Sequence, residues 1–162
     1  MRRLVLIGIV VAALFGAAAD AVPVRRVDAG HGLSVVLPHG WRLSHARVSS
    51  CSDPLQRFVA VAGDVNPRPA MSVPAGSAVV LVQESWHGHF PARPGSFALP
   101  RLGNVGGCCE IPEGQGAELI FRDQGRRFYA FVYVHSPEQR RDAISLLNGL
   151  KVATTPEAGA GA

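Results

Sequence analysis

The stretch RFYAFVYVHSPEQRRDAISLLNGLKV, residues 127–152, decides the fold because it joins a strand pattern directly to a helix pattern. In its first part, alternate residues fall into two rows, as the side chains of a β-strand do. One row holds Phe128, Ala130, Val132 and Val134, and the other holds Tyr129, Phe131 and Tyr133. We therefore expect a strand over residues 127–135.

The helix that follows this strand has a well-marked beginning. Ser136 is a favourable N-cap residue, and Pro137 suits the first helical position. Gln139 completes a Ser-x-x-Gln capping box, and Glu138 lies at the positive end of the helix dipole. The sequence therefore predicts a helix that begins directly after Ser136.

The same helix carries apolar residues on one face, at the spacing of helical turns. These residues are Ala143, Ile144, Leu147 and Leu150. Gly149 is expected to end the helix as its C′ residue, and residues 150–152 are expected to leave as a short last strand.

Upstream of this stretch, apolar segments separated by Gly- and Pro-rich turns predict further strands. Residues 84–116 are expected to be irregular, with a short extended piece at 96–99. The predicted strands or extended segments are 22–29, 33–37, 41–48, 57–62, 78–83 and 117–122. Two hairpins are expected, with turns at 30–32 and 123–126. This order predicts an α+β fold, with a mostly antiparallel sheet of about six strands and a C-terminal helix packed on one face.

Two of these segments, LSVVLPHGW at 33–41 and FYAFVYVHSPEQRRDAISLLNGLKV at 128–152, resemble the Mog1/PsbP-like group. Domains of that group begin with a strand that ends in a Pro-Gly-Trp type of turn, and they close with a strand, a helix and a short extended segment. More narrowly, the chain is similar to uncharacterised exported proteins of high-GC actinobacteria. The resemblance covers about residues 27–152. It implies a fold and carries over no catalytic residue, because members of the group have unrelated functions.

The N-terminus has the three parts of a secretory signal peptide. Arg2 and Arg3 are followed by a 13-residue apolar run, LVLIGIVVAALFG, and then by AAADA. Residues 1–21 are therefore predicted to be removed after Ala21, which places the protein outside the cytoplasm, secreted or in the cell envelope. The alternative is a retained membrane anchor. Residues 22–152 are expected to form one domain, and residues 153–162 a disordered tail.

The basic character of the chain does not indicate nucleic-acid binding. The sequence holds 16 Lys and Arg residues against 12 Asp and Glu residues, a formal net charge of +4. These basic residues are scattered, with no cluster longer than a doublet, whereas nucleic-acid sites gather them on one face.

Export permits disulfides, and the chain has three cysteines. A bridge between the adjacent residues Cys108 and Cys109 would close a strained ring. The preferred prediction is a bridge from Cys51 to Cys108, with Cys109 as the alternative partner. The reasoning is that the loops carrying them meet if the strands at 57–62 and 117–122 start at the same end of the sheet. The remaining thiol is expected to be buried, or to cross-link two chains if it is exposed.

Other residues offer weaker candidates for a site. In the stretch WHGHF, His87 and His89 could face one side of an extended segment. Together with Cys108, Cys109 and Glu110 they could bind zinc or copper. Trp86 and Phe90, in the same Gly- and Pro-rich loop, either pin the loop or form a binding surface.

No catalytic motif is recognisable, and neither a phosphate-binding glycine loop nor a G-x-S-x-G elbow is present. We therefore expect an exported binding or interaction module without a cofactor, which binds a protein or a small ligand in the cell envelope. The alternative is a small metal- or thiol-dependent enzyme that uses the Cys and His loops.

Overall fold

A computed structural model describes residues 25–105 and 111–154 of the chain. These residues form two antiparallel sheets and one helix, so the expected α+β class is confirmed. The predicted signal sequence, the Cys108–Cys109 pair and residues 155–162 of the predicted tail lie outside the described residues. Within the two described ranges, no helix is long and apolar enough to span a membrane.

The larger sheet has six strands in the order β3-β4-β5-β8-β7-β6, and neighbouring strands are antiparallel. The central strand β5 is buried along its whole length, as expected from its continuous apolar run. The strands are β3 (Trp41–Ser44), β4 (Leu55–Ala62), β5 (Ala78–Ser85), β6 (Gly103–Val105), β7 (Gly114–Asp123) and β8 (Arg126–Tyr133).

The smaller sheet has the order β1-β2-β9 and was not expected as a separate sheet. Its strands are β1 (Arg26–Gly30), β2 (Leu33–Val36) and β9 (Lys151–Val152). The predicted N-terminal hairpin and the predicted last strand are both present, and β2 pairs with both β1 and β9. The beginning and the end of the described domain therefore meet in one sheet.

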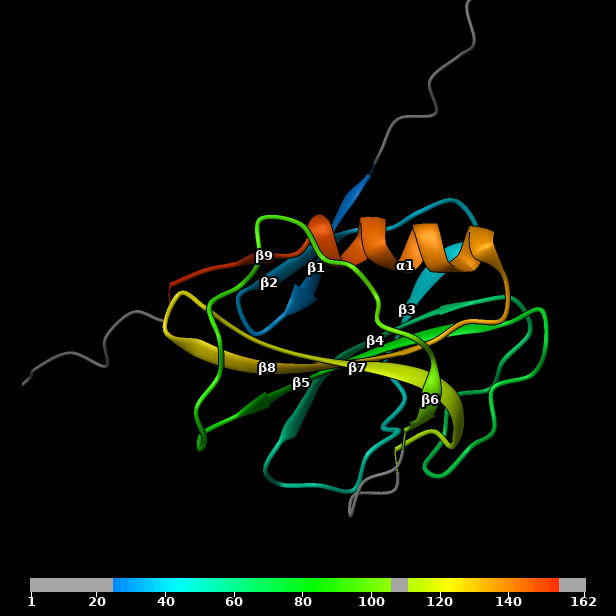
Figure 1. Cartoon of the computed structure of the whole chain (residues 1–162), viewed down its shortest axis with the longest axis horizontal. Coiled ribbons are helices and arrows are strands. Elements are labelled where there is room, and N and C mark those ends of the chain that lie inside the picture. The colour runs from blue at the N-terminus through cyan, green and yellow to red at the C-terminus, as the bar shows by residue number, and fades with distance from the viewer. Residues whose placement is uncertain (1–24, 106–110, 155–162) are drawn as a thin grey trace, which may run out of the picture.

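The helix α1 (Pro137–Asn148) and the smaller sheet lie on one face of the larger sheet (Figure 1). The first core fills the space between them. It contains the predicted row of β8 residues, together with Ala143 and Leu147 of the helix and Leu33 and Val35 of β2. The predicted packing of the helix on one face is thus confirmed, with Leu146 buried as well and Ile144 only partly buried.

The beginning of α1 agrees with the predicted capping box. The Oγ of Ser136 accepts a hydrogen bond from the backbone N–H of Gln139 at 3.1 Å. In return, the Oε1 of Gln139 accepts a hydrogen bond from the backbone N–H of His135 at 2.7 Å. Backbone donors at the start of the helix therefore have partners before any tertiary contact is considered.

The end of α1 differs from the prediction in its geometry. Gly149 caps the helix with φ −76° and ψ −8°, which is right-handed backbone rather than the left-handed C′ conformation. A Cβ atom at this position would lie 3.0 Å from the Cβ of Val36 in β2. Gly149 is therefore required by the close approach of β2 and not by its backbone angles.

The opposite face of the larger sheet carries a second core, which is covered by loops. Phe131 and Tyr133 of β8 lie in it and Tyr129 packs against it partly buried, so the second predicted row of this strand also faces a core. The loop residues that cover them include Val48, Met71 and Ile111. The larger sheet is thus enclosed on both faces, by a helix and a small sheet on one side and by connecting segments on the other.

The segment between β5 and β7 differs from the prediction. Residues 96–99, expected as a short extended piece in an irregular segment, are not part of a sheet, and Phe97 and Leu99 are buried in the first core. Instead, β6 forms at Gly103–Val105 by pairing with the first residues of β7. Two of the three β7 residues opposite β6 are glycines, so this pair of segments has no alternating side-chain pattern that would predict strands. The short strand β6 is therefore defined by its pairing with β7.

Candidate functional site

A buried carboxylate held by two guanidinium groups lies at one end of the larger sheet. The Nε and Nη2 atoms of Arg126 donate hydrogen bonds of 2.7 Å to the two carboxylate oxygens of Glu84. The Nε of Arg57 donates to the Oε2 of the same carboxylate at 2.6 Å. The side chains of Arg57, Arg126 and Glu84 are only 9%, 10% and 5% exposed. We call these three residues the Arg-Glu-Arg cluster.

The electrostatics of the cluster keep its carboxylate charged. Burial alone would raise the pKa of Glu84. The hydrogen bonds and positive charges of Arg126 and Arg57 outweigh that effect and hold the pKa of Glu84 below its ordinary value. With two cations and one anion, the cluster therefore has one uncompensated positive charge.

Three strands and a turn position the cluster. Glu84 is near the end of β5, Arg126 begins β8, and Arg57 lies in β4 at a bulge between Gln56 and Phe58. The Nη1 of Arg126 also donates a hydrogen bond of 2.9 Å to the carbonyl of His31, in the turn between β1 and β2. The cluster therefore joins the smaller sheet to the end of the larger one.

Trp86 forms the outer edge of this region. It follows β5 directly, and its backbone N–H donates a hydrogen bond of 3.1 Å to Asp53 Oδ1. The guanidinium carbon of Arg57 lies 5.4 Å from the centre of the Trp86 ring, within the range of a cation–π contact. Trp86 is nevertheless 55% exposed, so a large aromatic surface remains open beside a buried cation.

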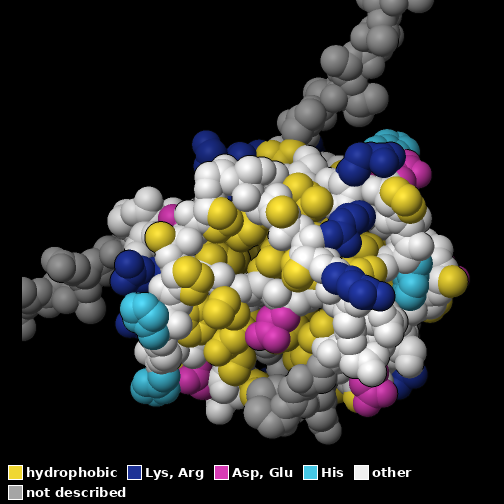
Figure 2. Space-filling model, viewed as in Figure 1, with side chains coloured by type: hydrophobic (Ala, Val, Ile, Leu, Met, Phe, Trp, Pro, Cys, Tyr) yellow, Lys and Arg dark blue, Asp and Glu magenta, His cyan; other side chains and the backbone are white. Residues whose placement is uncertain are grey.

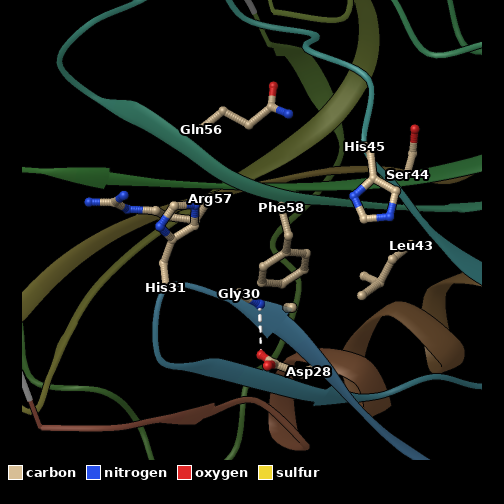
Figure 3. Close-up of a pocket in the computed structure, with 10 residues that line it drawn as sticks. Asp28, Gly30, His31, Leu43, Ser44, His45, Gln56, Arg57 and Phe58 are labelled. Carbon is tan, nitrogen blue, oxygen red and sulfur yellow. Dashed lines mark hydrogen bonds between the residues drawn. The ribbon is translucent and has the colours of Figure 1, made fainter.

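Two adjoining hollows open around Arg57. The Trp86 hollow, of about 410 Å³, is lined by the Arg-Glu-Arg cluster, Trp86, the turn residues His31 and Gly32, and the segment after β9. The His45 hollow, of about 510 Å³, is lined by residues of β1, β3 and β4. Both hollows are lined by His31 and Arg57. Figure 3 shows the guanidinium of Arg57 on the side of the His45 hollow that is farthest from His45 and Ser44.

Arg57 uses only part of its hydrogen-bonding capacity. A guanidinium carries five N–H donors, and within the described residues the only hydrogen bond from the Arg57 side chain is the one from Nε to Glu84. Its two terminal nitrogens therefore remain available at the hollows. A carboxylate or phosphate oxygen pair matches the spacing of these donors.

The structure separates the two predicted aromatic candidates. Phe90 is only 4% exposed and packs edge-on against Tyr129 with a centroid distance of 4.9 Å. Phe90 therefore pins the loop. Trp86 is exposed at the rim of a hollow, where a ligand can reach it.

The two predicted histidine ligands are both exposed. The Nε2 of His87 lies 3.9 Å from Asp53 Oδ2. Within residues 25–105 and 111–154, no group of three or more His, Cys, Asp or Glu side chains is placed to hold a metal ion.

The reasoning behind the predicted disulfide needs a correction. In the order β4-β5-β8-β7, every neighbouring pair is antiparallel, so β4 and β7 run in opposite directions and start at opposite ends of the sheet. Cys51 nevertheless packs against the second core, which also holds Val105 and Ile111. These two residues flank the segment that carries Cys108 and Cys109. The bridge itself involves residues outside those described and stays a prediction.

The sequence analysis missed the Arg-Glu-Arg cluster, because its members are 27 and 42 residues apart. One signal was available. Glu84 directly extends the apolar run of residues 78–83, so a strand that continued by one residue would bury a carboxylate and would need a cationic partner.

No protein-family profile matches the chain, and neither a curated protein nor a solved structure is significantly similar to it. The chemistry of the site therefore has to be argued from its own residues.

Proposed function

We propose that the protein is an exported binding module, and that the Trp86 hollow captures a ligand through a carboxylate or phosphate group. Export rests on the signal sequence predicted at residues 1–21. The resemblance of residues 33–41 and 128–152 to Mog1/PsbP-like domains is part of the same proposal, but it names no ligand.

One observation carries the proposal: Arg57 is nine-tenths buried, while its terminal nitrogens lack a hydrogen-bond partner within the described residues. These nitrogens are not among the fully buried side-chain atoms that lack a partner in the described residues, and Arg57 lines both hollows, so a ligand can reach them there. An anionic group at the Trp86 hollow would satisfy those donors and would also compensate the single excess positive charge of the cluster.

Trp86 indicates what the rest of the ligand resembles. Its ring is exposed beside Arg57, so a planar or apolar group attached to the anion can lie against it. Benzoate combines both features, acetate has only the carboxylate, and inorganic phosphate has only the anionic oxygens. We expect benzoate to bind more tightly than acetate.

The test is a titration of the mature protein with benzoate, acetate or phosphate. Two-dimensional NMR measures the shift of the Trp86 indole N–H signal at each ligand concentration and so gives the dissociation constant. Arg57→Lys keeps the positive charge but loses the forked pair of donors. It should weaken benzoate binding by about tenfold, the effect of one charge-assisted hydrogen bond.

Arg93 provides a matched control. It is also paired with a carboxylate, Asp123 at 2.8 Å, and lies over an aromatic ring, Phe97 at 5.3 Å. Its terminal nitrogens, however, already donate to Asp123 and to carbonyls at the end of α1. Arg93→Lys should leave benzoate binding unchanged. Equal weakening by both variants, or no saturable binding of any of the anions below about 50 mM, would overturn the proposal.

A further inference from the structure

The middle of β7 is an open sheet edge. On its outer side, β6 pairs only with Gly114–Gly116, and the segment around Ala92 pairs only at Arg122. Between these two contacts, the only strand that pairs with β7 within residues 25–105 and 111–154 is β8. We call residues 118–120 the β7 window.

The backbone groups in the window point outward. The N–H of Arg122 donates to the carbonyl of Pro91 at 2.7 Å, and its carbonyl accepts from the N–H of Arg93 at 2.9 Å, so both groups point away from β8. Backbone groups alternate in direction along a strand. The N–H and C=O groups of Ile120 and Glu118 therefore also point away from β8, and they have no hydrogen-bond partner in the described part of the chain.

The side chains around the window add an apolar surface with one acidic group. Ile120 is 45% exposed on one face of β7. On the other face, Leu119 and Leu102 are partly buried against the first core. Glu118 is exposed and lies on the same face as Ile120. Figure 2 shows hydrophobic side chains gathered on this side of the molecule, with an acidic side chain among them.

We propose that the β7 window binds an extended peptide segment of a partner protein, which adds a short antiparallel strand beside β7. The open backbone groups would bind the peptide main chain, as in other cases of strand addition. A peptide side chain opposite Leu119 would project towards Leu119 and Leu102, so it should be apolar. A side chain opposite Glu118 would lie beside that carboxylate, so it should be basic.

The size of the window decides the kind of occupant. Between Gly116, where the pairing with β6 ends, and the contact at Arg122, only Glu118 and Ile120 have outward backbone groups without a partner among the described residues. A strand that is already part of a second folded copy would collide with these two neighbours. A flexible peptide can enter with three residues and leave the edge on either side, so a partner segment without fixed structure fits better than a second copy of this chain.

The probe is a fluorescein-labelled peptide, Thr-Val-Leu-Lys-Thr, acetylated and amidated at its ends. Antiparallel pairing places Leu opposite Leu119, Lys opposite Glu118 and Val opposite Ile120. In this register the N–H groups of Val and Lys donate to β7, whereas that of Leu points away. N-methylation of Val and Lys together should weaken binding about tenfold or more, because two hydrogen bonds are lost. N-methylation of Leu should have little effect.

Two protein variants complete the test. Glu118→Lys should weaken binding of the Lys peptide and strengthen that of the same peptide with Glu in place of Lys. Ile120→Pro removes an outward N–H, a position at which an edge strand tolerates proline, and should abolish binding while the circular dichroism spectrum is retained. The proposal is wrong if the probe and its variants with Ile or Phe at the central position all fail to bind below about 1 mM. It is also wrong if the two N-methylated peptides bind equally well.

Discussion

Glu84 shows how a single residue can join two sheets. Its carboxylate is 5% exposed and accepts hydrogen bonds from arginines on the strands to either side of β5. One of them, Arg126, also reaches the carbonyl of His31 in the smaller sheet. Removing the carboxylate would leave two guanidinium groups facing each other at the junction, a costly arrangement in a buried site.

Glu84→Gln should lower the free energy of unfolding by about 3 kcal/mol at neutral pH. The folded-state pKa of Glu84 lies below its ordinary value of 4.5, so the ion pairs stabilise the protein fully above that value. This stabilisation is lost as the pH falls through the lowered folded-state pKa. Urea unfolding at about pH 7, 5 and 3 should therefore show similar differences between wild type and variant at the first two values and a smaller one at the third.

Glu118→Gln is the matched control for that measurement, because Glu118 is an exposed carboxylate on β7 without an ion pair among the described residues. It should change stability by less than about 0.5 kcal/mol. A Glu84→Gln effect that is equally small, or that does not decrease at low pH, would contradict the electrostatic account.

At the scale of elements, α1 was the most predictable part of the chain. Its start depends on Ser136, Pro137 and Gln139, which are adjacent in sequence, so local chemistry alone determines it. Gly149 was expected to stop the helix, but its backbone is right-handed and its small size serves contact with Val36. That contact is between residues far apart in the sequence, so no local pattern could reveal it.

The contact at Gly149 leads to a prediction about packing. Gly149→Ala introduces no backbone strain and lowers the entropy of the unfolded chain, which by itself would stabilise the protein. We expect it instead to destabilise by about 1 kcal/mol, because the added Cβ would lie 3.0 Å from Val36 and 3.2 Å from the carbonyl of Ser145. Thermal unfolding would show this as a lowered Tm.

Two further variants separate packing from other effects. Val36→Gly removes the Cβ that the added methyl group would meet. In that background the cost of Gly149→Ala should be smaller, so a double-mutant cycle should give a coupling of about 0.5 kcal/mol or more. At Gly95, an added Cβ meets no atom within 4 Å, and Gly95→Ala should be neutral or stabilising. A coupling of zero would show that Val36 is not the cause.

At the scale of the whole molecule, the α+β class, the two hairpins and the terminal helix could be predicted from alternation and turns. The division into two sheets could not, because β9 has two residues and is defined by its pairing with β2. The same holds for the site: Trp86 was identified from its loop, but Arg57, Glu84 and Arg126 come together only through the order of the strands.

The second core bears on the predicted disulfide. Cys51, Val105 and Ile111 all pack in this core, so both flanks of the Cys108–Cys109 segment are held near the loop of Cys51. Under oxidising conditions, Cys51→Ser should lower the free energy of unfolding by about 2–4 kcal/mol, because a bridge from Cys51 would close a long loop. With reductant present the difference from wild type should nearly disappear.

Cys109→Ser is the control for the choice of partner. If Cys108 forms the bridge, this variant should unfold like the wild type without reductant, whereas Cys108→Ser should resemble Cys51→Ser. Peptide mapping without reduction identifies the linkage directly. A Cys108–Cys109 linkage, or three thiols that react with iodoacetamide in the exported protein, would contradict the prediction.

The smaller sheet has a mechanical consequence. The chain enters the described domain at the start of β1 and leaves it after β9, and both strands are antiparallel to β2 between them. Tension between the two ends would therefore act along these strands and shear them past one another. Two residue pairs and the 2.8 Å hydrogen bond from Ala153 to Gly32 hold β9 to β2. The force that the domain withstands is thus set by its shortest strand, and β5 and β8 would carry no load until β9 had slipped.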